Sequence, residues 1–565
     1  MSLMSGLFVG TTGLRTSQNA LNTTAHNLSN IETQGYVRQQ TLLADMEYNN
    51  TGMASVSKMQ TGLGVEYAQV RQVRDYFLDQ SYRKEAGRSA FYEINYETTT
   101  EIETLLGEFD GVAFQDSLGS LWTSVQELQK DPSSSVTEGA FINTAAQFVE
   151  RAQAVYNGLS SYQDNLNSRV KEYVDKINNL GQKIFDLNVA IMTEELGEQD
   201  ANDLRDQRNL ALDELASLAN ISYSTNADGG IEVEVEGVSF VARDRVFDMG
   251  LERDEGTGFY TPIWPQNMNA EVFQKNQEIS TYLNTDVGEL KAIILARGDR
   301  RANYTDMNYE TYNNGKYTYY DSITGTTVTE DVIPTSASTV MDVQAQLDQM
   351  VHSIMTELNN IITGEKATID AGGTPTYSAA DDLPKELFVR LGTSRYADDG
   401  SGNYTYVQEL NNPASAYPSH ANIDELYTIS NIKINPDLLK TPSELARGFK
   451  TDDNMVDFDK ATQIADAFSN ASITLSPNLI QQYNYRDYYS AMVGQIATNG
   501  SVYSSVVSAQ EVATRQLYDA RDAVMGVSSN EELTNMIKYQ NAYNAASRYV
   551  TACNDMLENL LSSLG

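Results

Sequence analysis

The chain has few of the side chains on which most enzyme sites depend. Its 565 residues include one cysteine and three histidines, His26, His352 and His420, which lie far apart in the sequence. A zinc site needs three or four nitrogen or sulfur ligands, and this set can barely supply them. The sequence also lacks the glycine-rich loop of P-loop proteins and the GxSxG motif of serine hydrolases. We therefore predict no catalytic residue, no metal site and no cofactor, and interpret the protein as a non-enzyme.

Disulfide partners and long apolar runs are missing too. The single thiol, Cys553, can form no disulfide within the chain, and we interpret it as a small buried apolar residue. No stretch approaches the ~18 apolar residues of a transmembrane helix. The first residues have neither the basic segment nor the continuous apolar core of a Sec signal peptide. If the protein is extracellular, it leaves the cell by another route.

Positive charge is scarce as well. The chain has 39 lysines and arginines against 77 aspartates and glutamates, which gives a net charge of −38. A surface this acidic repels nucleic acid and anionic membranes, so we exclude both as partners. The same charge would keep an assembly-prone protein soluble before it assembles.

Both ends of the chain carry an apolar stripe with the alternating three- and four-residue spacing of a coiled coil. The N-terminal stripe consists of Leu3, Leu7, Gly10, Leu14, Ser17, Leu21, Thr24, Leu28 and Ile31. The C-terminal stripe consists of Met536, Tyr539, Tyr543, Ala546, Val550, Cys553, Leu557, Leu560 and Leu564. We expect these stripes to pair with each other, or with copies on neighbouring subunits, so that the two ends act as assembly elements.

Between the ends the pattern predicts a mixed, mainly α fold. Apolar heptads predict a long helix over 149–191 and another over 341–362, whereas the alternation at 231–237 predicts a half-buried strand after a turn at 226–230. We expect a helical-bundle rod with β-rich outer domains inserted in its middle. The predicted segments are an inner coiled-coil domain at 1–45 and 526–565, rod segments at 46–220, 341–363 and 426–525, a β domain at 221–298, a Tyr/Asn-rich insert at 299–340 and a β-rich insert at 364–425.

Two short motifs need an interpretation of their own. Gly526 is expected to end one helix, and Ser529 with Glu532 resembles a capping box that opens the last helix. Residues 297–299 spell Arg-Gly-Asp, a cell-adhesion tripeptide, but they follow a helix pattern rather than an obvious loop tip. We therefore interpret the tripeptide as part of a helix end.

The strongest motif is the segment 25–39, which reads AHNLSNIETQGYVRQ. It predicts a helix that ends in Asn and Thr side chains able to hydrogen-bond a turn, with Gly35 completing that turn. The segment resembles the signature of flagellar rod, hook and hook-associated proteins, and matches it at Asn27, Asn30, Thr33, Gly35 and Tyr36. One departure is Gln34, where that family usually has proline.

Three further segments narrow the resemblance to hook-associated members of that family. Residues 201–215 are similar to the family's ANDLxDQRDxLLDEL helix, with Asn209 in place of the usual Asp. Residues 288–297 resemble its GxLxGLLxxRD stretch, and residues 526–543 resemble its C-terminal helix, which begins GVSxDEE. The resemblance covers about 1–295, 341–362 and 485–565, and the two inserts have no counterpart in it.

The resemblance implies a structural subunit of the bacterial flagellum, in the ring that joins hook to filament. It implies that the terminal helices form an inner domain facing the export channel, and that the chain acts by packing. The partners it implies are further copies of the chain, the hook protein, a second junction protein, the flagellin filament indirectly and an export chaperone on the C-terminal helix. The protein would be secreted by the flagellar type III route and would lie outside the cell.

Three alternatives stay open at this point. A hook or rod subunit shares the first motif but should lack the 201–215 signature. A flagellin should show an Arg-Leu-Ser-Ser-Gly stretch after its first helix, and none follows here. The central inserts could also act as an enzyme or adhesin domain displayed on the junction. The small number of histidines weighs against an enzyme, and binding of host or surface ligands by residues 300–420 would indicate an adhesin.

Overall fold

The computed structural model describes residues 3–46, 49–50, 60–107, 114–197, 200–321, 326–380, 383–407, 425–449 and 455–564. His420 and much of the second predicted insert lie outside the described residues. Contacts divide the chain into two compact units. Unit 1 comprises 1–89, 176–249 and 510–565, and unit 2 comprises 90–175 and 250–509.

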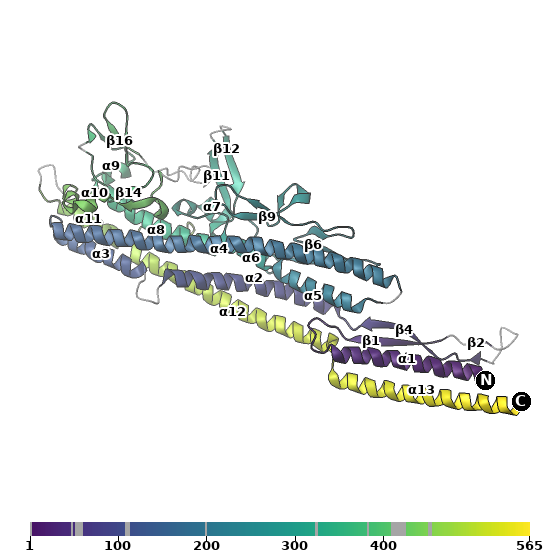
Figure 1. The fold of residues 1–565 in the computed structure, drawn as a ribbon. Helices are drawn as coiled ribbons and strands as arrows, with labels where there is room; N and C mark the ends of the chain where they lie inside the picture. Colours follow the sequence, from purple (N-terminus) through teal and green to yellow (C-terminus); the bar gives the residue numbers. More distant parts are fainter. Residues whose placement is uncertain are drawn as a thin grey trace. The chain divides into compact units, whose positions relative to one another are not determined.

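In unit 1 the two ends of the chain pair as long helices. α1 (Leu3–Ser29) lies beside α13 (Ser529–Leu564), as Figure 1 shows in purple and yellow. The contact is centred on Gly6, Gly10 and Gly13, of which Gly10 belongs to the predicted stripe, and the residues of α13 that face them include members of the predicted C-terminal stripe. Ideal Cβ atoms at these glycines would lie 3.3 Å from Cys553 Sγ for Gly6, 2.6 Å from Val550 Cγ2 for Gly10 and 3.6 Å from Ala546 Cβ for Gly13. The missing side chains allow the two backbones to approach closely.

The large apolar residues of the two predicted stripes differ in their exposure. The half-buried members are Leu7, Leu14, Leu21, Leu28, Met536, Tyr539, Val550 and Leu557, and the exposed members are Ile31, Tyr543 and Leu560. The side chains of Leu3 and Leu564 lie outside the described residues. α1 ends at Ser29, so Ile31 does not lie on the helix, as was predicted, but in the turn that follows it.

A two-stranded hairpin follows α1 and packs on it. β1 (Gln39–Asp45) pairs antiparallel with β4 (Val65–Gln72), and the shorter β2 (Asn49–Asn50) pairs with β3 (Gln60–Thr61). The Thr16 hydroxyl of α1 donates to the Val65 carbonyl oxygen at 3.4 Å. Gly64 has φ +103°, and a Cβ there would collide with the Thr12 hydroxyl. The hairpin therefore covers a second side of α1.

The rest of unit 1 joins three helices to a small sheet. The helical parts come from α2 (Tyr76–Leu106), α4 (Ser135–Glu195) and α5 (Asn202–Leu218), and α12 (Tyr485–Met525) ends in this unit. The sheet has the antiparallel order β5 (Ile221–Thr225), β6 (Ile231–Val235) and β7 (Val238–Val241). β6 alternates buried and exposed side chains, which confirms the predicted half-buried strand.

Side-chain amides of α4 attach small sheets to that helix. In unit 1 the Asn188 amide donates to the Ile231 carbonyl at 2.8 Å and accepts from the Ile231 N–H at 3.1 Å. Asn178 makes the same pair of bonds to Met249. In unit 2 Asn167 accepts from the Tyr260 N–H at 2.8 Å. Each amide satisfies backbone groups that would otherwise lack a partner beside the helix.

Unit 2 is built around α8 (Thr339–Ile362), whose apolar side chains are buried along its whole length. This element confirms the helix predicted over 341–362. Its companions are α3 (Phe114–Lys130), α6 (Glu289–Arg297) and α11 (Phe458–Ser469), with parts of α2, α4 and α12. The Phe114 ring lies 5.4 Å from that of Phe148 and 5.0 Å from that of Tyr489, so aromatic packing joins α3, α4 and α12.

The remaining strands and short helices of unit 2 lie in the predicted β domain, in the two predicted inserts and in the segment that follows the second insert. The strands form one sheet of β8 (Gly250–Arg253), β9 (Tyr260–Trp264) and β10 (Ala270–Glu271), the hairpin β11 (Lys316–Asp321) and β12 (Thr326–Asp331), a sheet of β13 (Thr376–Tyr377), β16 (Tyr404–Tyr406) and β15 (Tyr396–Asp398), and the pair β14 (Phe388–Arg390) and β17 (Ile432–Ile434). The short helices are α7 (Tyr309–Asn314), α9 (Lys366–Asp370), α10 (Pro436–Lys440) and the 3-10 turns η1 (Pro265–Asn267), η2 (Tyr304–Asp306), η3 (Thr335–Ala337), η7 (Ile429–Asn431) and η8 (Pro442–Arg447).

The fold class predicted from the sequence is confirmed: the chain is mainly α, with long helices at its ends and small sheets in its middle. The limits of the inner, rod and outer domains stay predictions.

Candidate functional site

Among the described residues, no group of three or more His, Cys, Asp or Glu side chains could hold a metal ion. Within those same ranges, no helix is long and apolar enough to cross a membrane. Each unit does contain clusters of polar side chains.

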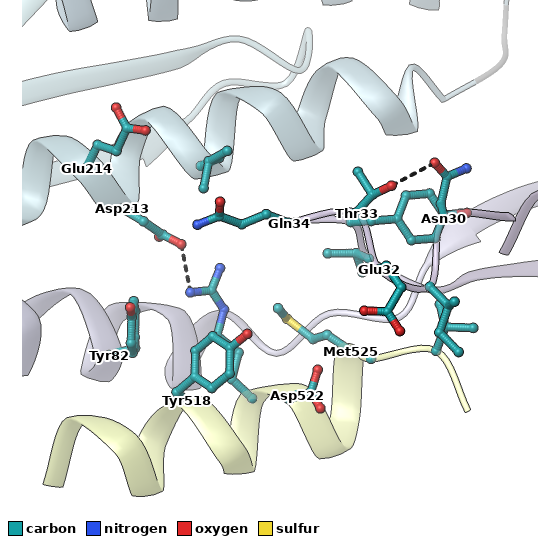
Figure 2. Close-up of a pocket in the computed structure, with 18 of the residues that line it drawn as sticks. Asn30, Glu32, Thr33, Gln34, Tyr82, Asp213, Glu214, Tyr518, Asp522 and Met525 are labelled. Atoms are coloured by element: carbon teal, nitrogen blue, oxygen red, sulfur yellow. Dashed lines mark hydrogen bonds and ion pairs between the residues drawn. The ribbon is translucent and has the colours of Figure 1, made fainter. Parts of the chain in front are cut away.

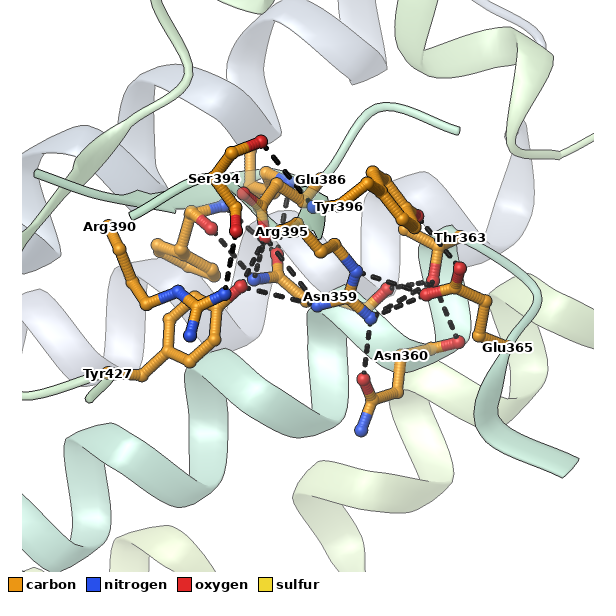
Figure 3. A network of polar contacts seen from close by, with 12 residues as sticks. Asn359, Asn360, Thr363, Glu365, Glu386, Arg390, Ser394, Arg395, Tyr396 and Tyr427 are labelled. Carbon is orange, nitrogen blue, oxygen red and sulfur yellow. Dashed lines mark hydrogen bonds and ion pairs between the residues drawn. The ribbon is translucent and has the colours of Figure 1, made fainter. Parts of the chain in front are cut away.

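One polar cluster lies at the end of α8 in unit 2 (Figure 3). The Arg395 guanidinium donates to Glu365 Oε2 at 2.7 Å and lies 3.5 Å from Glu386 Oε2, and both ion pairs are nearly inaccessible to solvent. Tyr396 and Tyr427 donate their hydroxyl protons to the same two carboxylates. Burial raises the pKa of Glu386, and the Arg395 charge opposes that shift. Both carboxylates are thus paired with Arg395 and hydrogen-bonded to a tyrosine. The cluster therefore anchors the surrounding strands and offers no reactive group.

The Arg-Gly-Asp tripeptide is also part of the interior of unit 2. Arg297 is only 1% exposed and donates to Asn167 Oδ1 at 2.6 Å and to the Tyr260 carbonyl at 3.0 Å. Burial lowers its pKa to about 10. Asp299 accepts from the Ile333 N–H at 2.7 Å. A receptor could not reach the Arg297 side chain, so the tripeptide is a structural feature of the α6 terminus.

In unit 1 the segment 27–39 forms a closed turn. Asn27, which is 1% exposed, accepts from the Tyr36 hydroxyl at 2.8 Å and from the Gln39 N–H at 3.0 Å, and donates to the Gln39 carbonyl at 2.9 Å. Asn30 Oδ1 accepts from the Thr33 hydroxyl at 3.1 Å. The hydrogen bonds of one side chain thus join the last turn of α1 to the first residue of β1.

Gly35 and Tyr36 also shape the turn, and only the conformation of Gly35 was predicted. Gly35 has φ +80°, as predicted, and the Leu210 side chain lies 3.5 Å from where its Cβ would be. Burial raises the pKa of Tyr36, with a further contribution from the charges of Asp203, Asp206 and Glu532. The Tyr36 hydroxyl consequently keeps its proton and acts as a donor to Asn27.

The turn is held against α5, the second segment singled out in the sequence. Asp206 Oδ2 accepts from the Val37 N–H at 3.0 Å, and its Oδ1 accepts from Gln72 Nε2 at 2.6 Å. Burial raises the pKa of Asp206 to about 7, although both hydrogen bonds and the Arg74 charge act in the opposite direction. Asp203 accepts from Gln39 Nε2 at 2.9 Å. Two carboxylates one helical turn apart therefore bind one side of the turn.

The turn also contacts the connection between α12 and α13, the third segment singled out. The Arg38 N–H donates to the carbonyl of Met525, the last residue of α12, at 2.8 Å. Its guanidinium binds Glu532 Oε1 at 3.0 Å and Glu531 Oε2 at 2.8 Å in the first turn of α13. The three segments, which are distant in the sequence, meet at one place, which we call the hub.

The predicted capping box of α13 is wrong. α13 begins at Ser529, and the side chain that accepts from the helix is that of Ser528, which bonds the Glu531 N–H at 3.5 Å. Glu532 does not reach back to the N-terminus of the helix, because it is buried and paired with Arg38. The prediction that Gly526 ends the preceding helix is confirmed, since α12 ends at Met525.

Buried ion pairs next to the hub connect the helices around it. Arg521 of α12 binds Asp79 Oδ1 at 2.8 Å and Asp213 Oδ2 at 2.7 Å, and Arg83 binds the other oxygen of Asp213 at 2.7 Å. Arg74 Nε donates to the second oxygen of Asp79 at 2.5 Å. Removal of one member of a buried pair leaves an uncompensated charge, which costs about 3–5 kcal/mol. The network therefore fixes α2, α5 and α12 around the turn.

A pocket of about 530 Å³ opens beside this network (Figure 2). The turn supplies Glu32 and its neighbours, α5 supplies Asp213 and Glu214, and α12 supplies Arg521 and Asp522. Its wall carries four carboxylates and one guanidinium, which is itself paired with Asp213. The arrangement provides packing surface and negative charge, and the motif residues Asn30, Thr33, Gly35 and Tyr36 lie along its wall.

The chain matches known flagellar proteins. Residues 99–374 match the family model described as the flagellar hook-associated protein FlgK helical domain. Residues 523–563 match the model described as the flagellar basal body rod FlgEFG protein C-terminal. Flagellar hook-associated protein 1 of Bacillus subtilis is 24% identical over 583 residues, which span 100% of this chain and 99% of that protein. The chain is thus similar over its full length to flagellar hook-associated protein 1 and contains that protein's helical domain.

Two further proteins of the same name match over nearly the full length of the chain. The proteins of the same name from Salmonella typhimurium and Escherichia coli are 22% and 21% identical, and each alignment spans 97% of this chain and 98% of the relative. A solved structure titled as the flagellar hook junction protein FlgK from Burkholderia pseudomallei aligns over 79% of this chain and 100% of its own, with 12% identity and a TM-score of 0.49.

The family explains why certain residues were found from the sequence and others were not. The turn residues Asn27, Asn30, Thr33, Gly35 and Tyr36 carry a family motif, and the structure brings them together. Arg38, Asp206 and Glu532 lie inside the recognised segments, but nothing in their spacing indicated that they contact one another. The one feature that could have linked them is their charge, because Arg38 is basic and Asp206 and Glu532 are acidic.

Proposed function

We propose that this chain is a structural subunit of the bacterial flagellum that forms the ring between hook and filament. It acts by packing and performs no catalysis. The observation that carries the proposal is the pair of terminal helices in unit 1, which leaves large apolar side chains exposed on both partners. Met4 and Phe8 on α1, and Ile537, Met556 and Leu561 on α13, are each between 47% and 67% exposed.

These side chains are the means by which copies would join. Complete burial of one large apolar side chain contributes about 1.5–3 kcal/mol. Several such side chains along two paired helices can therefore stabilise contact with neighbouring copies, whereas large exposed apolar patches on a monomer usually mark an interaction site. These exposed side chains, together with the stripe residues from Leu3 to Ile31 and from Met536 to Leu564, are the proposed assembly seam.

The remaining partners follow from position in the flagellum. Hook protein would contact the ring on one side and a second junction protein on the other, with flagellin reached through the latter. An export chaperone would bind the C-terminal helix before assembly, since α13 exposes apolar side chains that need cover in the cell. Secretion by the flagellar type III route would place the protein outside the cell, at the hook–filament junction.

Labelling of intact flagella tests the location. An antibody against this chain should mark a single narrow band where hook meets filament in electron micrographs. Label along the whole hook or filament would instead identify a bulk subunit of the tube, and label elsewhere on the cell would favour the adhesin alternative. That alternative has lost its sequence motif, because the Arg297 side chain is buried.

A matched pair of variants tests the packing. Replacement of Ile537 and Leu561 by serine removes two exposed apolar side chains and should leave the isolated chain folded, because neither contributes to its core. The variant should be exported but absent from the junction band. Asn554→Ser, an exposed polar change on the same helix, is the control and should assemble normally. Normal assembly of the double variant would contradict the proposed seam.

A further inference from the structure

The connection between α12 and α13 is an elbow of three residues, Gly526, Val527 and Ser528. It joins the terminal helix pair of unit 1 to the rest of that unit. So short a link limits the distance between the two helices but does not by itself fix the angle between them. Some other contact has to hold α13 in one direction.

Arg38 contacts both sides of this elbow. Its backbone N–H bonds the Met525 carbonyl at the end of α12, and its guanidinium binds two carboxylates in the first turn of α13. Its own carbonyl accepts from the Val73 N–H at 2.9 Å, so the residue is anchored to the strand segment that precedes α2. One residue thus spans the joint, and its backbone is fixed independently of the joint.

The charges make this contact directional. Glu532 is 2% exposed, and a buried carboxylate without a cation is strongly disfavoured. Glu531 and Glu532 also occupy the N-terminal turn of α13, where negative charge stabilises a helix, so the helix itself does not depend on Arg38. The expected consequence of losing the guanidinium is therefore a change of direction of α13 rather than its unfolding.

The structure also leaves room for such a change. The pocket of about 530 Å³ is lined on one side by Asp522, Met525, Gly526 and Val527, the residues on which the elbow would turn. The pocket is also lined by the carboxylates of Glu32 and Glu214. The elbow consequently has space beside it, and the contacts of Arg38 add to the packing of α13 on α1 in preventing movement into that space.

We propose that Arg38 is the positioning residue that fixes the angle between α12 and α13. This inference rests on the proposed function, because a ring of identical subunits requires the terminal helix pair to point in one direction in every copy. The angle itself, however, is a property of the single chain and can be measured without any ring.

The test uses the full-length chain with Cys553→Ala, which leaves no other thiol. Cysteines at the exposed positions Asp519 on α12 and Asn544 on α13 carry spin labels, and double electron–electron resonance measures the distance between them. Arg38→Gln keeps a polar side chain without the charge, and should convert one narrow distance distribution into a broad or multiple one. Arg15→Gln, on the exposed face of α1, is the control and should leave the distribution narrow.

A narrow, unshifted distribution in Arg38→Gln with unchanged helix content would overturn the inference. Should Arg38→Gln fail to fold, Glu531→Gln is the deciding variant, because this carboxylate is largely exposed. Its loss should broaden the distance distribution partly. An unbroadened distribution would refute the positioning role of Arg38. Failure of the ring proposal would show itself separately, as misplaced antibody label on flagella with a normal distance distribution in the isolated chain.

Discussion

Gly10 offers a quantitative test of how closely α1 and α13 approach. An ideal Cβ on Gly10 would lie 2.6 Å from Val550 Cγ2 and 3.1 Å from the nearest carbon of Tyr549, so Gly10→Ala forces α13 or these side chains to shift. Gly13, one turn further along the same helix, is the matched control. Its Cβ would lie 3.6 Å from that of Ala546, which is an ordinary contact.

The two substitutions share one term and differ in another. Alanine in place of glycine inside a helix is favourable by about 1 kcal/mol at both positions. Overpacking a close contact costs about 1–3 kcal/mol, and only Gly10→Ala incurs it. Gly13→Ala should therefore stabilise the helix pair by up to about 1 kcal/mol, and Gly10→Ala should leave it unchanged or weaken it by about 2 kcal/mol. The difference between the variants isolates the overpacking term.

Amide hydrogen exchange on the full-length chain, read by mass spectrometry over α13, measures that difference. A change of 1.4 kcal/mol alters the exchange rate about tenfold where exchange reports the opening equilibrium. The C-terminal helix should exchange faster in Gly10→Ala than in Gly13→Ala by about one to two orders of magnitude. Equal exchange in the two variants would show that the helices do not meet at Gly10 and would refute the glycine-centred contact.

Three further perturbations test the rest of unit 1. Gly181→Ala would press on the Phe240 ring and should destabilise the β5–β7 sheet by about 1–3 kcal/mol, seen as faster exchange there, whereas Gly494→Ala has open space and should be slightly stabilising. Asn27→Ala removes three hydrogen bonds of the turn and should lower the urea midpoint by the equivalent of about 1–3 kcal/mol. Burial raises the pKa of Asp206 to about 7. The stability that its protonated form contributes is therefore full below about pH 4 and is lost as the pH rises to 7. Asp206→Asn should flatten this part of the curve of urea midpoint against pH.

Periodicity in the sequence was sufficient to predict the long helices and the pairing of the two ends. It identified only part of the centre of their contact. The predicted stripes include Gly10, Ala546, Val550 and Cys553, but they leave out Gly6 and Gly13, which also lie close to α13. The reason is steric: at a close crossing the central positions must be small, and a repeat that scores hydrophobicity gives small residues little weight.

The asparagines of α4 were missed for a related reason. Asn167, Asn178 and Asn188 are spaced by eleven and ten residues, which is close to three helical turns, so they share one face of the helix. The apolar heptad of that helix is the stronger pattern, and the prediction of the helix rested on it alone. Their function, which is to bond the backbone of strands far along the chain, depends on tertiary contacts that local spacing does not contain.

The hub illustrates what a family motif can and cannot reveal. The turn after α1 resembles a local element, because Tyr36 bonds Asn27, while Asn30 bonds its near neighbours His26 and Thr33. Its backbone N–H groups at Val37 and Arg38, however, bond Asp206 and Met525, which belong to the other two recognised segments. The three signatures are therefore parts of one contact, and each requires the others to satisfy its buried polar groups. A sequence shows such a contact as three separate motifs, and only the fold shows that they constrain one another.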